Sequence, residues 1–194
     1  MRVIGGESRG RILKAPSGYR TRPTSDKVRE AIFDMLPHRL EGLKALDLFA
    51  GSGAMGIEAL SRGAIRAVFI ESSRVVSAVI KANIRACNLD DRAKVMVGRL
   101  PQALMRVLKM EGPFDIVFID PPYEKGLAEK TLDVLIRGSG VAPGGRVVIE
   151  HSAREETPEE TADLVKIRMK RYGSTAVSIY ERESLKDGQK QKTG

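Results

Sequence analysis

The sequence predicts an α/β protein built on a doubly wound, mostly parallel sheet of seven strands that closes with an antiparallel hairpin. Two observations favour this fold. Past residue 43, short β-branched apolar runs alternate with amphipathic stretches of 9 to 16 residues, and only short links join them. Such alternation is typical of βαβ units with parallel strands and right-handed crossovers. A glycine-rich turn, LFAGSGAMG, also follows the first apolar run, where doubly wound folds bind their ligands.

The individual elements follow from this pattern in chain order. Strands are expected at residues 44–49, 66–71, 93–98, 114–120 and 145–150, and helices at 54–63, 73–88, 100–110 and 126–138. After residue 150 the alternation weakens, and residues 163–173 and 174–183 predict a hairpin that is split at Gly173 and Ser174. In a doubly wound order the strand at 114–120 lies next to the first strand, so the carboxyl ends of the two strands form a shared ligand site.

Two flanking segments complete the predicted organisation. Residues 1–43 are expected to form a basic extension packed on the core, with a small hairpin over 2–16 and a helix over 24–36 that Pro23 and Thr24 open. Residues 44–182 are expected to form the core domain, and residues 183–194 a polar tail.

Composition favours a single-domain protein of the cytoplasm. The chain has 194 residues, of which 42% are hydrophobic, and a mean hydropathy of −0.21. It contains no apolar run of about 18 residues that could cross a membrane, and its N-terminus lacks the apolar stretch of a signal peptide. One cysteine excludes an internal disulfide and a cysteine metal cluster. The two histidines have no acid or cysteine at a useful spacing, so no metal is expected.

The positive charge is concentrated at the N-terminus. The whole chain has a net charge of +8, and residues 1–22 carry six basic residues against one acid. Four glycines lie among these basic residues, which suits a backbone that rests against another molecule. The pattern predicts contact with a polyanion such as RNA. The basic residues expected to bind RNA are Arg9, Arg11, Lys14, Arg20 and Arg22.

The glycine-rich turn contains Gly51, Gly53 and Gly56, which spell the G-x-G-x-x-G dinucleotide fingerprint. Gly56 has the alternative role of letting helix and strand pack closely. Asp47 precedes the turn, inside the first strand, and an acid there attracts a ligand with positive charge. Glu71 ends the second strand, where a carboxylate accepts hydrogen bonds from an adenosine ribose. Together these residues suit S-adenosylmethionine, an adenosine with a cationic amino-acid portion and no pyrophosphate.

The strand at 114–120 runs into the sequence Asp-Pro-Pro-Tyr, residues 120–123, which is stiffer than a simple turn needs. The exocyclic amine of a nucleobase is a poor nucleophile because its lone pair is delocalised into the ring. The Asp120 carboxylate and the Pro121 carbonyl would accept the amine hydrogens and free that lone pair, and Pro122 helps to hold the carbonyl rigid. The Tyr123 ring offers a stacking platform for an unstacked base. The tetrapeptide therefore predicts a catalytic clamp for a planar amine.

These motifs also carry a family resemblance. DLFAGSG, Glu71 and DPPY resemble the amino-group branch of the class I S-adenosylmethionine-dependent methyltransferases. Within that branch, IGGESRGRIL, TRPTSDKVREAIFDML and AMGIEALSRGA resemble the RsmD family of bacterial 16S ribosomal RNA guanine-N2 methyltransferases. The resemblance covers about residues 2–150. It implies a monomer that moves a methyl group from S-adenosylmethionine to a guanine N2 amine in the 16S ribosomal RNA of the small subunit.

Carried onto this chain, the resemblance implies a role for each motif. The segment from Asp47 to Gly53 should hold the methionine part of the donor, Glu71 the ribose, and residues 120–123 the guanine. Many relatives have Asp or Asn after the third strand, near the adenine, but this chain has VGRLPQ there. Arg99 and the Leu100 backbone are the nearest candidates for that contact. The expected donor-binding residues are Asp47, Phe49, Ala50, Gly51, Ser52, Gly53, Glu71, Ser72, Arg99 and Leu100.

Three alternatives stay open at this point. DNA and protein amino-methyltransferases share the DPPY motif, although the chain lacks an obvious target-recognition domain for DNA and its basic N-terminus suits RNA better than protein. An NAD-dependent oxidoreductase would leave Asp47 and the proline clamp unexplained. A non-catalytic RNA-binding module would need neither the loop glycines nor a donor. Calorimetry with S-adenosylmethionine and with NAD separates these alternatives.

Overall fold

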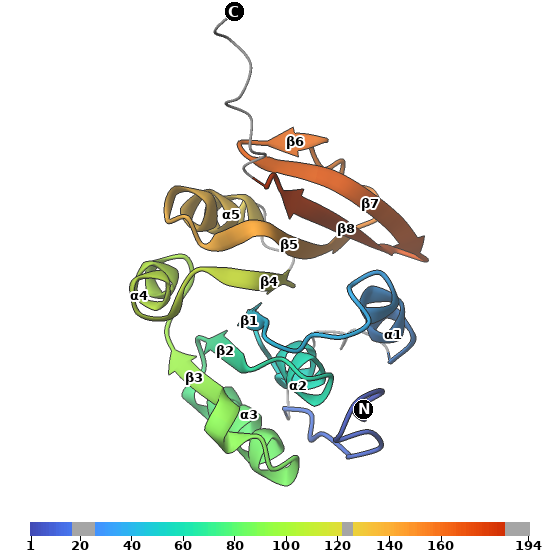
Figure 1. Ribbon diagram of the computed structural model, residues 1–194, viewed down its shortest axis with the longest axis vertical. Helices are drawn as coiled ribbons and strands as arrows, with labels where there is room; N and C mark the ends of the chain where they lie inside the picture. Colours follow the sequence, from blue (N-terminus) through green and yellow to red (C-terminus); the bar gives the residue numbers. More distant parts are fainter. Residues whose placement is uncertain (17–25, 122–125, 185–194) are drawn as a thin grey trace, which may run out of the picture.

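Eight strands form one sheet in the order β3-β2-β1-β4-β5-β8-β7-β6, with helices on both faces (Figure 1). The computed structural model describes residues 1–16, 26–121 and 126–184. Strands β1 to β5 are parallel, and β8, β7 and β6 continue the sheet in antiparallel fashion. The strands are β1 (Lys44–Leu48), β2 (Arg66–Glu71), β3 (Ala93–Val97), β4 (Phe114–Ile119), β5 (Val141–Ser152), β6 (Glu160–Thr161), β7 (Leu164–Tyr172) and β8 (Thr175–Arg182). The helices are α1 (Asp26–Asp34), α2 (Ala54–Ser61), α3 (Arg74–Ala86), α4 (Gln102–Glu111) and α5 (Leu127–Arg137), with a short 3-10 helix at Asp90–Arg92.

The predicted alternation is confirmed, and so is the position of β4 beside β1, where Leu48 aligns with Ile119. The C-terminal hairpin is also confirmed, because β7 and β8 pair through a turn at Gly173, whose φ angle is 63°. The predicted number of seven strands is wrong, since the two-residue β6 adds an eighth. Strand β5 is longer than predicted at both ends, as it starts at Val141 and ends at Ser152.

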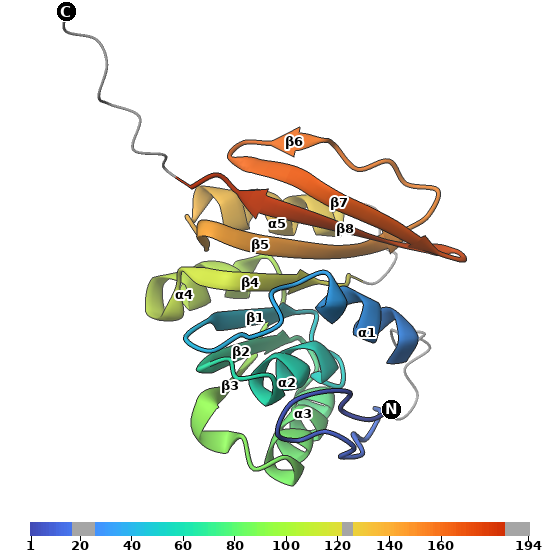
Figure 2. The same ribbon diagram turned by 45° about the vertical axis from the view of Figure 1, so that its right-hand side comes forward.

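Two hydrophobic cores hold the helices against the two faces of the sheet (Figure 2). The core under α1, α2 and α3 includes Ile32, Phe33, Ile57, Leu60, Ile80 and Ile84. The core under α4 and α5 includes Leu104, Val107, Leu108 and Leu135. The central strands are therefore covered on both sides, which explains their continuous apolar sequences. Among the helices in the described ranges, none is long and apolar enough to cross a membrane.

The N-terminal extension packs on α2 and α3. Its predicted hairpin is reduced to one antiparallel bridge, between Arg2 and Ile12. Glu58 of α2 is fully buried, and its carboxylate accepts hydrogen bonds of 2.8 Å from the backbone N–H groups of Ile4 and Gly5. Hydrogen bonds to a buried charged group are stronger than those between neutral groups, so this carboxylate fixes the start of the chain on the core.

The helix predicted within this extension is α1, which begins at Asp26. Its predicted opening residues, Pro23 and Thr24, lie outside the described residues. Arg29 of α1 is buried and forms ion pairs with Asp26 at 3.1 Å and with Glu58 at 3.9 Å. Glu58 therefore joins α1, α2 and the first residues of the chain into one unit.

Candidate active site

Three acidic side chains meet at the carboxyl ends of neighbouring parallel strands. Asp47 lies in β1, Glu71 ends β2, and Asp120 directly follows β4. Besides burial, the negative charges of Asp120 and Glu71 raise the pKa of Asp47, so both of these carboxyl groups lie within electrostatic reach of Asp47. The doubly wound order thus brings together acids that are far apart in the sequence, at the edge where such sheets bind ligands.

Asp47 is almost fully buried, with 3% of its surface exposed. Its Oδ2 atom accepts a hydrogen bond of 2.9 Å from the backbone N–H of Gly56, in the first turn of α2. Burial raises the pKa of Asp47 to about 8, and the hydrogen bond from Gly56 opposes this shift only in part. The carboxyl group is therefore mostly neutral near pH 7 and ionises more readily when a cation approaches. Sequence reasoning predicted the attraction to a cation but missed the contact with α2.

The turn between β1 and α2 has an unusual backbone. Phe49, Gly51 and Gly53 have positive φ angles of 61°, 54° and 78°. Such an angle is rare for a bulky residue like Phe49 and costs about 1–3 kcal/mol, so the surrounding structure must hold it in place. Hydrogen bonds run from the Ala50 N–H to the Ile70 carbonyl (3.1 Å) and from the Gly53 N–H to the Ala50 carbonyl (2.6 Å). These bonds fix one shape of the turn above the sheet edge.

The three glycines of this turn have different surroundings. Among the described residues, a Cβ atom at Gly51 would meet only one backbone carbonyl oxygen, 3.8 Å away, so this part of the structure leaves space above Gly51 for a ligand. A Cβ atom at Gly53 would lie 2.9 Å from Ile80. One at Gly56 would lie 2.3 Å from the Phe69 ring. Gly56 therefore serves the close packing of α2 on β2, which is the alternative role that its sequence position left open.

Glu71 is held at the rim of the site by groups around it. Its Oε1 atom accepts hydrogen bonds from the Ser73 N–H (2.8 Å) and the Ser72 hydroxyl (3.2 Å). Its Oε2 atom accepts one from the Gly51 N–H (3.2 Å). A carboxylate has about four lone-pair positions and three of them are used here, so Glu71 has one left for a hydroxyl of a ligand. The predicted residues Gly51, Glu71 and Ser72 thus lie together.

The segment after β3 lies beside Glu71, where the adenine contact is predicted. The Gly98 N–H donates a hydrogen bond of 2.9 Å to the Glu71 backbone carbonyl. Arg99 is exposed, and Leu100 is half-buried against the core under α4. The position of this segment agrees with an adenine contact, and the individual roles of Arg99 and Leu100 stay predictions.

Half of the predicted clamp lies within the described residues. Asp120 is exposed and Pro121 is partly exposed, at the end of β4 and beside the turn that follows β1. Pro122 and Tyr123 lie outside the described residues, so their roles stay predictions. Because Ile119 aligns with Leu48 of β1, Asp120 lies beside the start of the turn that is predicted to hold the donor.

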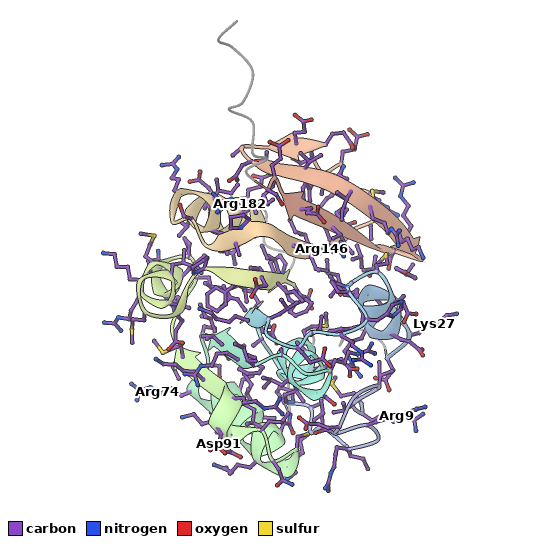
Figure 3. The ribbon with its side chains drawn as sticks, viewed as in Figure 1. Arg9, Lys27, Arg74, Asp91, Arg146 and Arg182 are labelled. Atoms are coloured by element: carbon purple, nitrogen blue, oxygen red, sulfur yellow. The ribbon has the colours of Figure 1, made fainter. Side chains whose placement is uncertain are left out.

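The basic residues of the N-terminal extension are at the surface. Arg9, Arg11 and Lys14 are all exposed, whereas Arg20 and Arg22 lie outside the described residues. Figure 3 shows Arg9 and Lys27 of α1 on the same side of the molecule. These exposed cations are accessible to a polyanion.

Asn83 of α3 joins the N-terminal extension to the glycine-rich turn, and sequence reasoning missed it. Only 1% of Asn83 is exposed. Its Nδ2 atom donates hydrogen bonds to the carbonyl oxygens of Ser52 (2.9 Å) and Lys14 (3.0 Å). Its Oδ1 atom accepts one from the Lys14 N–H (2.8 Å). The available signal was a polar residue on the apolar face of a predicted helix, next to Ile84.

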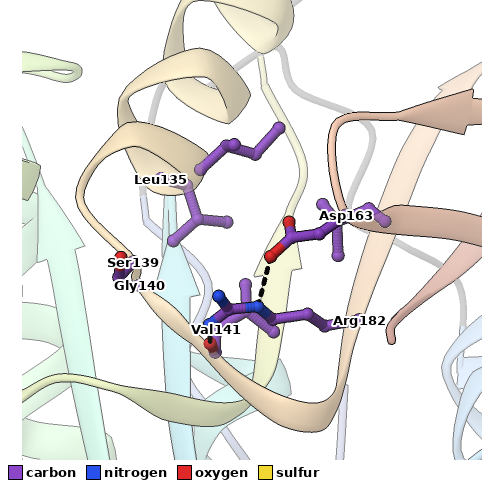
Figure 4. Close-up of a pocket in the computed structure, with 8 residues that line it drawn as sticks. Leu135, Ser139, Gly140, Val141, Asp163 and Arg182 are labelled. Atoms are coloured by element: carbon purple, nitrogen blue, oxygen red, sulfur yellow. Dashed lines mark hydrogen bonds and ion pairs between the residues drawn. The ribbon is translucent and has the colours of Figure 1, made fainter. Parts of the chain in front are cut away.

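A separate hollow lies at the opposite edge of the sheet (Figure 4). Residues from α5 and from the starts of β5 and β7 line it. Arg182 crosses this hollow, where it forms an ion pair with Asp163 and donates a hydrogen bond to the Val141 carbonyl. Because its charged groups are paired with each other, this hollow is a structural contact rather than part of the active site.

Comparisons with known proteins place the chain in a family. A family model described as "Conserved hypothetical protein 95" matches residues 1–181. The chain is 37% identical to the ribosomal RNA small subunit methyltransferase D of Escherichia coli (strain K12), over 95% of this chain and 91% of that protein. It is 40% identical to the Bacillus subtilis (strain 168) protein named "Putative rRNA methyltransferase YlbH", over 94% of this chain and 99% of that protein.

A solved structure agrees with these matches. "Putative methyltransferase yhhF from Escherichia coli" superposes with a TM-score of 0.82 at 37% identity, over 95% of this chain and 98% of that chain. The similarity therefore includes the N-terminal extension and the C-terminal hairpin as well as the parallel core. By the family model and by these relatives, the chain belongs to the RsmD family, the family that its sequence motifs resemble.

Proposed function

We propose that this protein transfers a methyl group from S-adenosylmethionine to the exocyclic N2 amine of a guanine in 16S ribosomal RNA. The observation that carries the proposal is the meeting of Asp47, Glu71 and Asp120 around an open glycine-rich turn. Groups suited to a cationic donor and to an amine acceptor thus lie side by side at one edge of the sheet. The name of the Escherichia coli relative supports small-subunit ribosomal RNA as the substrate class.

The residues around the turn fit S-adenosylmethionine better than a dinucleotide. Glu71 can accept a hydrogen bond from a ribose hydroxyl, and the open space above Gly51 lets a ligand approach the backbone. A cationic group would stabilise the ionised form of the buried Asp47, whereas a pyrophosphate would keep this carboxyl group protonated and gain no charge interaction from it. When bound, S-adenosylmethionine supplies a methyl group on a positively charged sulfur.

The protein's part in the chemical step is to prepare the guanine amine. The Asp120 carboxylate and the Pro121 carbonyl accept hydrogen bonds from the two amine hydrogens, which turns the nitrogen lone pair towards the methyl group. A bond forms between this nitrogen and the methyl carbon, the carbon–sulfur bond breaks with its electron pair left on sulfur, and one proton leaves the nitrogen. Asp120 is exposed at the end of β4, so it can accept that proton and pass it to water.

The RNA itself would be held by charge. Arg9, Arg11 and Lys14 are exposed cations that suit phosphates, and Asn83 joins the backbone of Lys14 to the glycine-rich turn. The proposal keeps the expectation of a cytoplasmic monomer that needs no metal. The choice of guanine N2 as the methylated atom rests on two arguments. The sequence resembles the RsmD family, and the predicted clamp at residues 120–123 suits a planar amine.

Methyl transfer from radiolabelled S-adenosylmethionine tests this proposal. We would offer 16S ribosomal RNA, duplex DNA and ribosomal proteins in parallel, and we expect label in the RNA alone. Calorimetry should show binding of S-adenosylmethionine and none of NAD. Label in DNA or protein, or binding of NAD in place of S-adenosylmethionine, would contradict the proposal.

Donor affinity should rise with pH between about pH 6 and 7.5, because donor binding favours the ionised form of Asp47. The pKa of Asp47 is about 8 in the free protein, so the group is mostly protonated over this range. Binding therefore releases a proton, and the association constant should rise by at most about tenfold per pH unit. Above this range the donor's own amine begins to lose its charge.

Calorimetry at several pH values measures this slope, and Asp47→Asn is the matched control. The asparagine keeps an oxygen acceptor for the Gly56 N–H but cannot titrate, so the variant should lose the pH dependence. A variant with the same slope as the wild type would show that another group is responsible.

Asn83→Ala should weaken donor binding through the turn that Asn83 supports. The change leaves the Ser52 carbonyl and the backbone groups of Lys14 without this partner. We expect the free energy of unfolding in urea to fall by about 1–3 kcal/mol, and donor affinity to fall several-fold.

Ser77→Ala is the control for Asn83→Ala. Ser77 is also buried on α3, but its hydroxyl donates to the Ser73 carbonyl (2.8 Å) within the same helix. This variant should lose some stability and keep the donor affinity of the wild type. If both variants bind donor equally well, Asn83 stabilises the fold without positioning the turn.

A further inference from the structure

Strand β7 presents an unpaired edge of the sheet over most of its length. One edge pairs with β8 throughout, whereas on the other edge β6 pairs only with Leu164 and Val165. One further bond runs from the Lys166 N–H to the Glu159 carbonyl (2.8 Å). Within the described ranges, the outer edge of residues 167–172 therefore faces no other strand. Natural proteins usually protect such an edge or use it.

This half of β7 is basic and contains no acid. Residues 166–172 are KIRMKRY, and residues 167–171 are all exposed. Arg168 aligns with Ile179 of β8. Lys170 aligns with Val177, so no acidic side chain faces either cation across the sheet. In the part of the chain that the structure describes, neither Arg168 nor Lys170 belongs to an ion pair.

Arg168 and Lys170 lie on the α1 side of the sheet, because their aligned partners in β8 belong to the core under α1. The acids of the β5–β6 connection lie elsewhere. Glu159 forms an ion pair with Lys166, at the start of the basic segment. Burial lowers the pKa of His151, and the charge of Glu155, which lies nearby, opposes this shift in part. Acids do lie near this face, since burial and the charge of Asp34 of α1 raise the pKa of Tyr172, and Glu150 of β5 aligns with Val177, the partner of Lys170. Arg168 and Lys170 are nevertheless exposed and outside every ion pair of the described residues.

This surface is on the same edge of the molecule as the active site. Strand β7 runs parallel to β5, because each is antiparallel to β8, so β7 ends at the carboxyl edge of the parallel strands. Strands β5 and β8 separate β7 from β4, and three strand spacings amount to about 14 Å. Figures 1 and 2 show the end of β7 and the first segment of the chain, residues 1–16, on opposite sides of α1.

We propose that β7, through Arg168 and Lys170, binds the sugar-phosphate backbone of the substrate RNA beside the target base. The inference rests on the proposed function, because it takes RNA to be the substrate. RNA that crosses the carboxyl edge meets the N-terminal extension on one side of Asp120 and β7 on the other. Exposed cations on an acid-free strand suit phosphates, which fix the position of an RNA without reading its bases.

Two double variants of the full chain test this surface. Arg168→Gln/Lys170→Gln removes the two cations of β7. The matched control, Arg106→Gln/Lys109→Gln, removes the same charges from exposed positions of α4, on the far side of the molecule in Figure 1. Binding to a 16S ribosomal RNA transcript is measured over a series of salt concentrations, together with donor binding and sedimentation of each protein.

The β7 variant should bind the transcript more weakly and with a flatter salt dependence. The slope of log K against log salt should fall in magnitude by about 0.7 per contact, or about 1.4 for both. Donor affinity should not change, and the α4 control should keep the slope of the wild type.

A β7 variant with the slope of the wild type would overturn the inference. So would a variant that self-associates while its RNA binding is unchanged, because that result indicates charges that only prevent sheet edges from pairing. Failure of the proposed function has a different signature, because the wild-type protein itself would then leave the transcript unmethylated, whatever the salt dependence of its binding.

Discussion

Asp120→Ala should slow methyl transfer by about 10²- to 10³-fold, equivalent to ~3–4 kcal/mol of transition-state stabilisation. The carboxylate is one of two acceptors proposed for the guanine amine, and its effect grows as the nitrogen becomes tetrahedral. Donor binding should survive, because Asp47 keeps its contact with α2 and Glu71 keeps its contacts with the turn. The loss should therefore appear in the chemical step alone.

Single-turnover transfer at saturating donor and RNA measures this step, with donor binding measured on the same proteins. Asp91→Ala is a suitable control, since Asp91 is an exposed acid of the 3-10 helix, away from the site (Figure 3). It should transfer at the wild-type rate. Near-normal transfer by Asp120→Ala would refute the clamp, and so would equal losses of rate and donor affinity.

Gly51→Val should weaken donor binding by about 100-fold or more, which corresponds to at least ~2.7 kcal/mol of binding free energy. A side chain at Gly51 would enter open space above the turn, where the ligand is expected to meet the backbone. Gly53→Val is a poorer test, because its Cβ would lie 2.9 Å from Ile80 and folding itself would suffer. Calorimetry with S-adenosylmethionine measures the effect.

Gly42→Val separates ligand exclusion from backbone strain. Gly42 also has a positive φ angle, of 82°, and no atom of the described residues lies within 4 Å of the Cβ position. It precedes β1, at the edge of the sheet opposite the site, so the variant carries similar strain without touching the donor loop. Thermal unfolding should show comparable losses of stability in the two variants. A Gly51→Val protein that binds donor like Gly42→Val would show that the turn has only a structural role.

The central part of the sheet was predictable because its strands are buried on both faces and have continuous apolar sequences. The ends of β5 were not predictable in this way. Pro143 and Gly144 are typical of a turn, yet they lie within β5, next to a shift in its pairing with β4. Strand β6 has two residues and no pattern of its own, so only the path of the chain beside β7 creates it. Long-range pairing decides such elements, and a single sequence does not display it.

The site was predictable where it depends on strand ends and unpredictable where it depends on tertiary contacts. Asp47, Glu71 and Asp120 follow from their positions at the carboxyl ends of parallel strands. The role of Asn83 could not be predicted from the sequence, because its partners lie in two segments that only the fold brings together. The raised pKa of Asp47 likewise depends on burial, which packing decides.

Mass spectrometry of the nucleosides from methylated 16S ribosomal RNA tests the central claim most directly. The wild-type protein is incubated with S-adenosylmethionine and unmodified transcript or small subunits, and the RNA is then digested to nucleosides. The proposed function predicts N2-methylguanosine as the new product, and far less of it with Asp120→Ala in the same time. A methyl group on another atom of guanine, a methyl group on another base, or no methylated nucleoside would contradict it.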